Sequence, residues 1–250
     1  MSVTDRLLRA IEREERAVLF TVIEGEPLGA HVLVVEGGER YGQGVPEEIL
    51  AQAETLIREH RSRIVEASGI KVFCDVYGPP PRLLVYGAVD TAEALCAAAR
   101  LLGWRTIVAD ARGKFATRDR LPSADEVIVA WPEEALAQVQ PDHATAIVVL
   151  THDDKFDVPA LKAALETEAF YIGALGSRRN QERRRQRLIE AGVSEGALER
   201  IYGPCGLDIG AESQPETALS ILAEIVAVRH GREGGQLRKA RQRIHAEVAG

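Results

Sequence analysis

The feature that most constrains the fold is an alternation of short apolar runs and helical segments that begins after Pro81. Each apolar run is continuous, which is typical of strands buried on both faces of a parallel sheet. The segments between them carry apolar residues at helical spacing, and several end at glycines such as Gly103, Gly192 and Gly231. With right-handed crossovers, this order predicts an α/β fold with a Rossmann-type doubly wound parallel sheet. The predicted strands lie within residues 82–87, 104–110, 125–130, 144–152 and 169–176.

The starts of the predicted helices rest on prolines and on small polar residues. Pro132 and Pro215 fit the first turn of a helix, where a missing N–H costs nothing. We expect Ser177, Asp157 and Asp90 to cap the helices that follow them, since short oxygen-bearing side chains accept hydrogen bonds from the first backbone N–H groups. Glu93 would complete a capping-box arrangement with Asp90.

The prolines at positions 79–81 mark the boundary between two domains, because proline neither donates to a β ladder nor continues a helix. Residues 1–78 contain β segments with glycine-rich turns and one helix opened by Pro46, which predicts a small α+β domain. Residues 79–231 hold the alternating pattern of the Rossmann-type domain. Residues 232–250 form a basic C-terminal tail.

Charge and hydropathy exclude several classes of protein. The formal net charge of −7 disfavours general nucleic-acid binding, which depends on phosphate neutralisation by Lys and Arg. No apolar run approaches the ~20 residues that cross a bilayer. The first 20 residues are charged and lack the apolar core of a signal peptide, so we expect a cytoplasmic protein. The three cysteines show neither a disulfide framework nor a CxxC metal pair.

The loop after the first predicted strand departs from the dinucleotide fingerprint G-x-G-x-x-G/A. Gly87 and Ala92 occupy its first and third positions, but Val89 replaces the glycine that lets a pyrophosphate approach the backbone. Asp90 places a carboxylate where a helix N-terminus would offer bare N–H groups. These substitutions disfavour, without excluding, phosphate binding of the usual kind at Gly87 and Ala88.

Two further loops at the same edge of the predicted sheet carry acids and a histidine. Asp110 ends the second strand at about the position where an acid accepts hydrogen bonds from a ribose, although aspartate is equally common in turns. His152 and Asp153 follow the fourth strand, and a histidine there could donate or accept a proton near neutral pH. A metal site is disfavoured because His152 and Asp153 are adjacent and no second histidine is near.

The loop GALGSRR, residues 173–179, offers the strongest chemical signal. Gly176 and Ser177 precede Arg178 and Arg179, and arginines in a first helical turn oppose the helix dipole. A bound phosphate would relieve this arrangement, and the alternative is a solvated basic helix face. The later stretch GPCGLDIGAES contains Gly206 and Asp208, and it predicts either a tight loop close to a ligand or a compact turn.

Four stretches resemble one known family. They are PPPRLLVYGA, THDDKFDVPALKAAL, AFYIGALGSRR and GLDIGAESQPETALSILAEIVAVRHG, and in this order they are similar to the XdhC/CoxI family from about Val72 to Gly231. Two stretches depart from the family pattern. Gly87-Ala88-Val89-Asp90 stands where the family usually has GAGH, and RYGQGVPEE contains no cysteine where the family commonly has SGGC.

The resemblance implies an accessory protein that matures molybdenum hydroxylases such as xanthine dehydrogenase. Such a protein binds molybdopterin or molybdopterin cytosine dinucleotide and assists its insertion into the apoenzyme, with a sulfurtransferase as a second partner. It implies no catalytic residue and no protein-bound metal, and a homodimer through the N-terminal domains is reasonable. The residues expected to bind the cofactor are Gly87, Ala88, Asp110, His152, Asp153, Gly176, Ser177, Arg178, Arg179, Gly206 and Asp208.

Two other functions remain open from the sequence. The first is an NAD(P)-dependent oxidoreductase, which Val89 and the absence of a substrate domain after the nucleotide domain disfavour. The second is a divergent interaction or regulatory module without a small-molecule ligand, which Val89, Asp90 and the missing cysteine favour.

Overall fold

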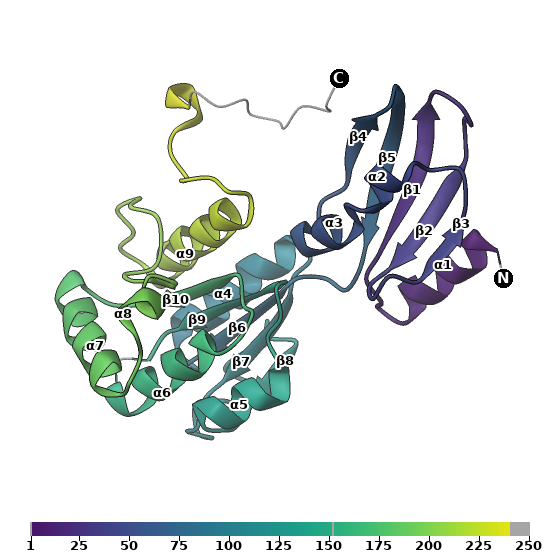
Figure 1. The fold of residues 1–250 in the computed structure, drawn as a ribbon. Coiled ribbons are helices and arrows are strands. Elements are labelled where there is room, and N and C mark those ends of the chain that lie inside the picture. The colour runs from purple at the N-terminus through teal and green to yellow at the C-terminus, as the bar shows by residue number, and fades with distance from the viewer. Residues whose placement is uncertain (1, 152, 241–250) are drawn as a thin grey trace. The chain divides into compact units, whose positions relative to one another are not determined.

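The computed structural model describes residues 2–151 and 153–240 of the chain. The chain divides into two units, which are described separately (Figure 1). The first unit contains the residues up to Pro79 together with the described residues from Gln236 onward, and the second unit contains Pro80–Gly235. No helix in the described part of the chain is long and apolar enough to span a membrane.

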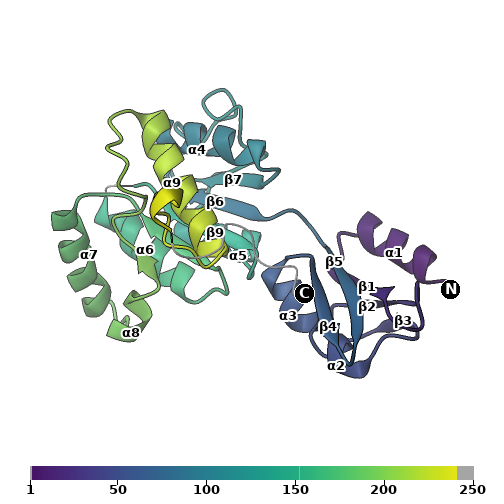
Figure 2. The same cartoon turned by 90° about the horizontal axis from the view of Figure 1, so that it is seen from above.

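The first unit is an antiparallel sheet with helices on both faces (Figure 2). Its strand order is β3-β2-β1-β5-β4. Val18, Phe20 and Val22 alternate along β1 and pack against α2 and α3, while Ala17 faces α1. Its elements are α1 (Val3–Glu12), β1 (Ala17–Glu24), β2 (His31–Val35), β3 (Arg40–Gly42), α2 (Glu47–Leu50), α3 (Ala53–Glu59), β4 (Arg63–Ala67), β5 (Ile70–Tyr77) and the short 3-10 helix η1 (Leu237–Lys239).

The second unit is a parallel sheet covered on both faces, in the strand order β11-β10-β9-β6-β7-β8. Along β6, Leu83 and Val85 pack under α4 and α9, whereas Leu84 and Tyr86 pack against α5 and α6. The predicted Rossmann-type doubly wound fold is therefore confirmed. Its elements are β6 (Arg82–Tyr86), α4 (Asp90–Leu101), β7 (Arg105–Ala109), β8 (Glu126–Ile128), α5 (Pro132–Val139), β9 (Thr145–Val149), α6 (Asp154–Leu165), β10 (Tyr171–Ala174), α7 (Arg178–Glu190), α8 (Glu195–Leu198), β11 (Ile201–Tyr202) and α9 (Gln214–Arg229).

Two of the predicted helix caps are wrong. Helix α4 has Val89 at its N-cap with no side-chain hydrogen bond, because the Asp90 carboxylate instead pairs with Arg120 at 3.2 Å. Helix α6 begins earlier than predicted, with Asp153 as its N-cap, and Asp157 lies inside the helix and is buried. The predicted cap Ser177 is confirmed at the start of α7.

The helix predicted after Pro46 is divided into two short helices, α2 and α3. Pro46 is the N-cap of α2, and the chain breaks helical continuity after Leu50 before α3 begins at Ala53. Both helices still bury their apolar side chains in one core cluster. The break therefore leaves the predicted apolar face in place. Pro132 and Pro215 lie in the first turns of α5 and α9, as predicted.

Candidate functional site

The carboxyl ends of the parallel strands bring the predicted loops to one edge of the second unit's sheet. Chain order reverses between β6 and β9, so the loops after these two strands lie side by side at the switch point where doubly wound folds bind ligands. The loops after β7 and β10 flank them. The edge thus gathers the loops that begin at Gly87, Asp110, Leu150 and Leu175.

Gly87 is the point of closest approach between two of these loops. Its φ is +116°, and a Cβ at this position would lie 2.9 Å from Thr151 Cγ2 and 3.0 Å from the Thr151 backbone nitrogen. The next residue, Ala88, is 2% exposed, and its N–H donates to Asp110 Oδ2 over 2.9 Å. Gly87 and Ala88 therefore join the loops after β6, β7 and β9.

Asp110 is occupied by hydrogen bonds from within the chain. Besides Ala88, the backbone N–H and Nε of Arg112 each donate to Oδ1 over 2.9 Å, and Arg112 Nη2 donates to Oδ2 over 2.8 Å. Burial on its own would raise the pKa of the Asp110 carboxyl, but these hydrogen bonds outweigh burial and hold the pKa below its usual value. The structure places the Asp110 carboxylate at the predicted edge, buried beneath Arg112.

The loop after β9 ends in an exposed cap and a buried hydroxyl. Asp153 is exposed and accepts a hydrogen bond from the Lys155 backbone N–H over 3.0 Å. Thr151 is buried, and its hydroxyl donates to the Asp157 carboxylate. His152 lies outside the described residues.

The start of α7 presents two arginines beside free helix N–H groups. Gly176 has a φ of +142°, and the Ser177 hydroxyl accepts the Asn180 N–H over 3.3 Å. Arg178 and Arg179 are exposed, the first turn of the helix holds no acid, and within residues 2–151 and 153–240 neither arginine pairs with a carboxylate. Arginine guanidinium groups and helix N–H groups together match the oxygens of a phosphate.

A buried ion pair beneath this loop is a feature that the sequence interpretation missed. Arg184 is 4% exposed, and its Nη2 donates to Asp157 Oδ2 over 2.7 Å and to the Leu175 carbonyl over 2.9 Å. Its Nη1 donates to Gln181 Oε1 over 2.7 Å, and Gln181 Nε2 donates to the Ala174 carbonyl over 3.0 Å. The α7 loop is therefore fixed to α6 by charge.

The spacing along α7 gives a weak sequence signal that Arg184 is buried. Arg184 stands four residues before Leu188, which is 1% exposed, so the two side chains share the inward face of α7.

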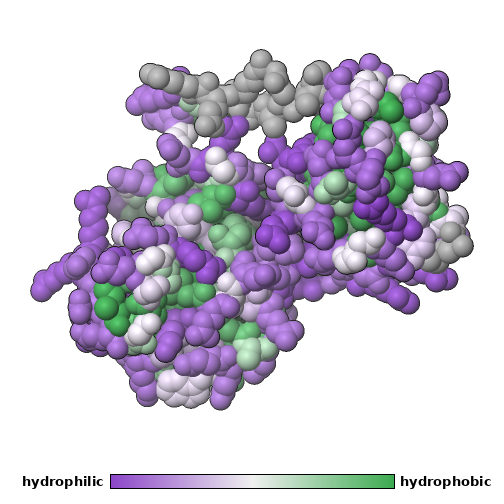
Figure 3. Space-filling model, viewed as in Figure 1, coloured by the Kyte–Doolittle hydropathy of each residue, from purple (hydrophilic) through white to green (hydrophobic). Residues whose placement is uncertain are grey.

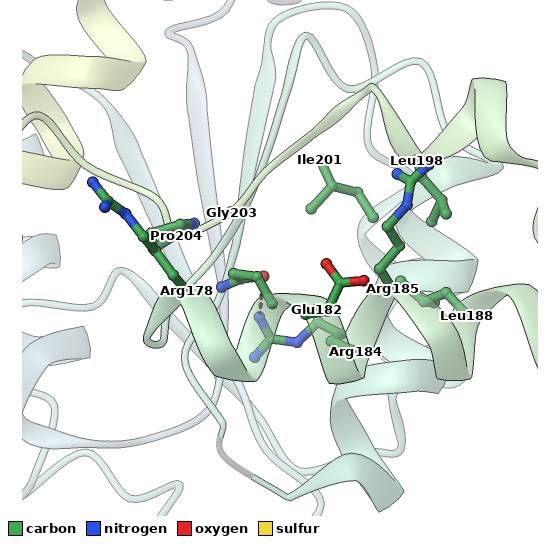
Figure 4. A pocket seen from close by; sticks show the side chains of 10 residues that line it. Arg178, Glu182, Arg184, Arg185, Leu188, Leu198, Ile201, Gly203 and Pro204 are labelled. Atoms are coloured by element: carbon green, nitrogen blue, oxygen red, sulfur yellow. Dashed lines mark hydrogen bonds between the residues drawn. The ribbon is translucent and has the colours of Figure 1, made fainter.

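A pocket of about 240 Å³ lies beside the predicted anion loop, between α7 and the segment from α8 to Pro204 (Figure 4). Figure 3 shows apolar surface between α7 and α8, surrounded by polar side chains. Apolar and charged side chains both line the pocket. Its lining residues are Arg178, Gln181, Glu182, Arg184, Arg185, Leu188, Leu198, Ile201, Gly203 and Pro204.

The glycine-rich loop before α9 is held against that helix. The Gly206 N–H donates to Glu224 Oε2 over 2.9 Å, and a Cβ at Gly206 would lie 2.5 Å from Ser220 Oγ. Asp208 in the same loop is exposed. These contacts are those of a compact turn, and they place Gly206 against α9 and leave Asp208 in solvent.

Exposed cations lie at this edge although the whole chain carries a formal net charge of −7. Lys114 and Lys155 are exposed on the β7–β9 side, and Arg178 and Arg179 are exposed on the β10 side. The exposed carboxylates of Asp90 and Asp153 lie at the same edge, so the attraction for an anionic ligand is strongest at the start of α7, where the first turn holds no acid. The described residues contain no group of three or more His, Cys, Asp or Glu side chains arranged to hold a metal ion.

Comparison with known proteins identifies similar sequences. The XdhC Rossmann domain family matches residues 83–225. The chain is 35% identical over 151 residues to a Bacillus subtilis protein named as a probable xanthine dehydrogenase subunit, a match that covers 60% of this chain and 44% of that protein. It is 33% identical over 153 residues to the molybdenum cofactor insertion chaperone PaoD of Escherichia coli, covering 61% of this chain and 42% of that protein. The matches thus span less than half of these curated relatives.

A solved structure shares the fold along nearly the whole chain. It is a crystal structure described as a xanthine dehydrogenase from Bacillus halodurans, with a TM-score of 0.55 and 20% sequence identity. The match covers 96% of this chain and 98% of that one.

Proposed function

Because the chain belongs to the XdhC family through its Rossmann domain, we propose that it is an accessory protein that binds a molybdenum cofactor for insertion into a molybdenum hydroxylase. Relatives named as a molybdenum cofactor insertion chaperone and as a probable xanthine dehydrogenase subunit support this role. Under this proposal the chain binds and presents the cofactor, and the hydroxylase carries out the reaction. The bound cofactor supplies the redox chemistry of its metal.

The observation that carries the proposal is the pair of exposed arginines at the N-terminus of α7. Molybdopterin and molybdopterin cytosine dinucleotide share a phosphate group, and Arg178, Arg179 and the first N–H groups of the helix fit such a group. Gly176 supports the same assignment, because its φ of +142° turns the chain directly into the helix. The ion pair between Arg184 and Asp157 holds this loop in place.

The first loop fits a phosphate poorly. The Ala88 N–H is already bonded to Asp110, and the Asp90 carboxylate lies in the first turn of α4. We therefore assign the phosphate to α7 and give Gly87 and Ala88 the role of joining the loops around the crevice. The proposed partner is a hydroxylase apoenzyme. A sulfurtransferase is a further proposed partner on the family resemblance, and a second copy of the chain is one through an apolar interface between N-terminal domains.

A binding titration tests the phosphate assignment. Purified protein is titrated with molybdopterin and with its cytosine dinucleotide, and binding is followed by calorimetry or by quenching of pterin fluorescence. Arg178→Ala removes one charge-assisted contact, which is worth about 1.5–3 kcal/mol, so we expect affinity to fall by about tenfold or more.

Arg183→Ala is the matched control. Arg183 lies on the same helix and is exposed, but it faces Asp154 at 3.8 Å, so its loss should change affinity little. Equal affinities for the wild type and Arg178→Ala would refute the assignment to α7. Failure of the wild type to bind either form of the cofactor would refute the proposed function itself.

A further inference from the structure

Arg112 lies over Asp110 at the carboxyl end of β7. Three of its N–H groups bond to Asp110, two through the guanidinium and one through the backbone. Its Cζ also lies 4.5 Å from the centroid of the Phe115 ring and 5.5 Å from that of Phe156. A planar cation is thus held by one carboxylate and two aromatic rings, all supplied by this chain.

This is the position at which a Rossmann domain holds the nucleoside of a dinucleotide. The acid at the end of the second strand normally accepts hydrogen bonds from the ribose hydroxyls. Here the Asp110 carboxylate is 1% exposed and accepts four hydrogen bonds, which is about the full capacity of its two oxygens. No acceptor site is left for a ribose while Arg112 remains in place.

We infer that Arg112 competes with a ribonucleoside for this position, so that the domain disfavours every dinucleotide that must place a ribose against Asp110, whichever base it carries. A nucleoside that enters the position must break a bidentate, charge-assisted pair and displace a cation from aromatic rings. The position follows from the strand order, and the competition follows from the bonds of Arg112 to Asp110 and its contact with Phe115. It goes beyond the proposed accessory function and does not depend on it.

Removing the arginine side chain should open the position. In Arg112→Ala the carboxylate of Asp110 keeps its bonds to the two backbone N–H groups and regains acceptor sites for a ribose diol. Adenosine and NAD+ serve as probes at millimolar concentration, with binding measured by saturation-transfer NMR and calorimetry. We expect the wild type to bind adenosine at most very weakly and Arg112→Ala to bind it about tenfold more tightly or better, as two or more new hydrogen bonds would give.

Arg120→Ala is the matched control, because Arg120 lies 5.2 Å from the same Phe115 ring but pairs with Asp90 instead of Asp110. Arg120→Ala should bind adenosine no more tightly than the wild type. The double variant Arg112→Ala/Asp110→Asn should bind adenosine less tightly than Arg112→Ala alone. If Arg112→Ala does not fold, Arg112→Lys keeps a cation but cannot form the planar bidentate pair, and a smaller gain is expected.

Two results would overturn the inference. One is equal affinity of the wild type and Arg112→Ala for adenosine and NAD+, and this includes the case in which neither protein binds them. The other is weaker binding of NAD+ or NADP+ by the variant, which would make Arg112 a ligand-binding group. Both results are independent of the cofactor titration with Arg178→Ala, so this inference and the proposed function can fail separately.

Discussion

At the scale of single residues, packing explains why position 87 is a glycine although Val89 replaces the second glycine of the dinucleotide fingerprint. Its φ of +116° lies in a region that side chains rarely adopt, and Thr151 occupies the space of a Cβ. Both requirements come from the packing of the β6 loop against the end of β9. A glycine is therefore needed for the β6 loop to pack against Thr151, whether or not a phosphate binds there.

Replacing this glycine should destabilise the second unit. Gly87→Ala forces a positive φ on a residue with a Cβ and brings that Cβ within 2.9 Å of Thr151, so we expect a loss of about 2–4 kcal/mol in the free energy of unfolding. Gly103→Ala is the control, because Gly103 has a φ of +73° but nothing within 4 Å of its would-be Cβ. Urea denaturation measures both. Equal losses would show that the contact with Thr151 contributes nothing.

The Asp110–Arg112 pair predicts a dependence of stability on pH. The pKa of Asp110 is lowered in the folded chain, so its ionised form stabilises the fold above the ordinary aspartate pKa of about 4, and this contribution is lost as the pH falls further. Asp110→Asn lacks the contribution at every pH. We therefore expect the stability difference between wild type and Asp110→Asn to be largest near pH 7 and to shrink toward pH 3, as measured by urea denaturation. A difference independent of pH would contradict the pairing.

At the scale of secondary-structure elements, the arginine-rich helix α7 combines an exposed face with one buried charge. Most of its arginines are exposed or form loose surface pairs, as when Arg185 lies 3.6 Å from Glu199. Arg184 instead reaches Asp157 on α6, with side chains 5% and 3% exposed. The sequence of α7 predicts a solvated basic helix. The exception depends on an acid 27 residues earlier, which no local pattern reveals.

Breaking the buried Arg184–Asp157 pair should lower the free energy of unfolding far more than breaking a neighbouring, more exposed pair. Asp157→Ala leaves the Arg184 charge buried without its acid, and we expect a loss of about 3–5 kcal/mol in unfolding free energy. Asp154→Ala, which removes the partly exposed pairs to Arg187 at 2.8 Å and to Arg183 at 3.8 Å, should lower the free energy of unfolding by at most about 1 kcal/mol. Chemical denaturation of the two variants compares them directly. Similar losses would mean that the buried pair contributes no more than a surface one.

At the scale of the whole molecule, the fold was predictable where it rests on periodicity. Continuous apolar runs predicted the central strands, and the motifs around GALGSRR predicted the family, which the comparisons confirm. Contacts between distant residues were not predictable. Asp90 has the local chemistry of a cap, yet it pairs with Arg120, and the short edge strand β11 depends on pairing with β10. The Ala88 N–H that bonds to Asp110 likewise comes from 22 residues earlier, whereas Arg112 lies only two residues away.

The three cysteines provide a test of how the molecule is divided. Cys74 belongs to the core of the first unit, whereas Cys96 and Cys205 share one core cluster in the second. Burial raises the pKa of each thiol to about 12, so all three are protonated and shielded at neutral pH.

We expect no alkylation by iodoacetamide in the native protein and complete alkylation in denaturant. Across a urea series followed by peptide mass spectrometry, Cys96 and Cys205 should become reactive at one common urea concentration, because they lose protection when the same core opens. Cys74 should become reactive when the first unit unfolds, at a urea midpoint different from that of Cys96 and Cys205. Separate midpoints for Cys96 and Cys205 would mean that the sheet of the second unit does not unfold cooperatively.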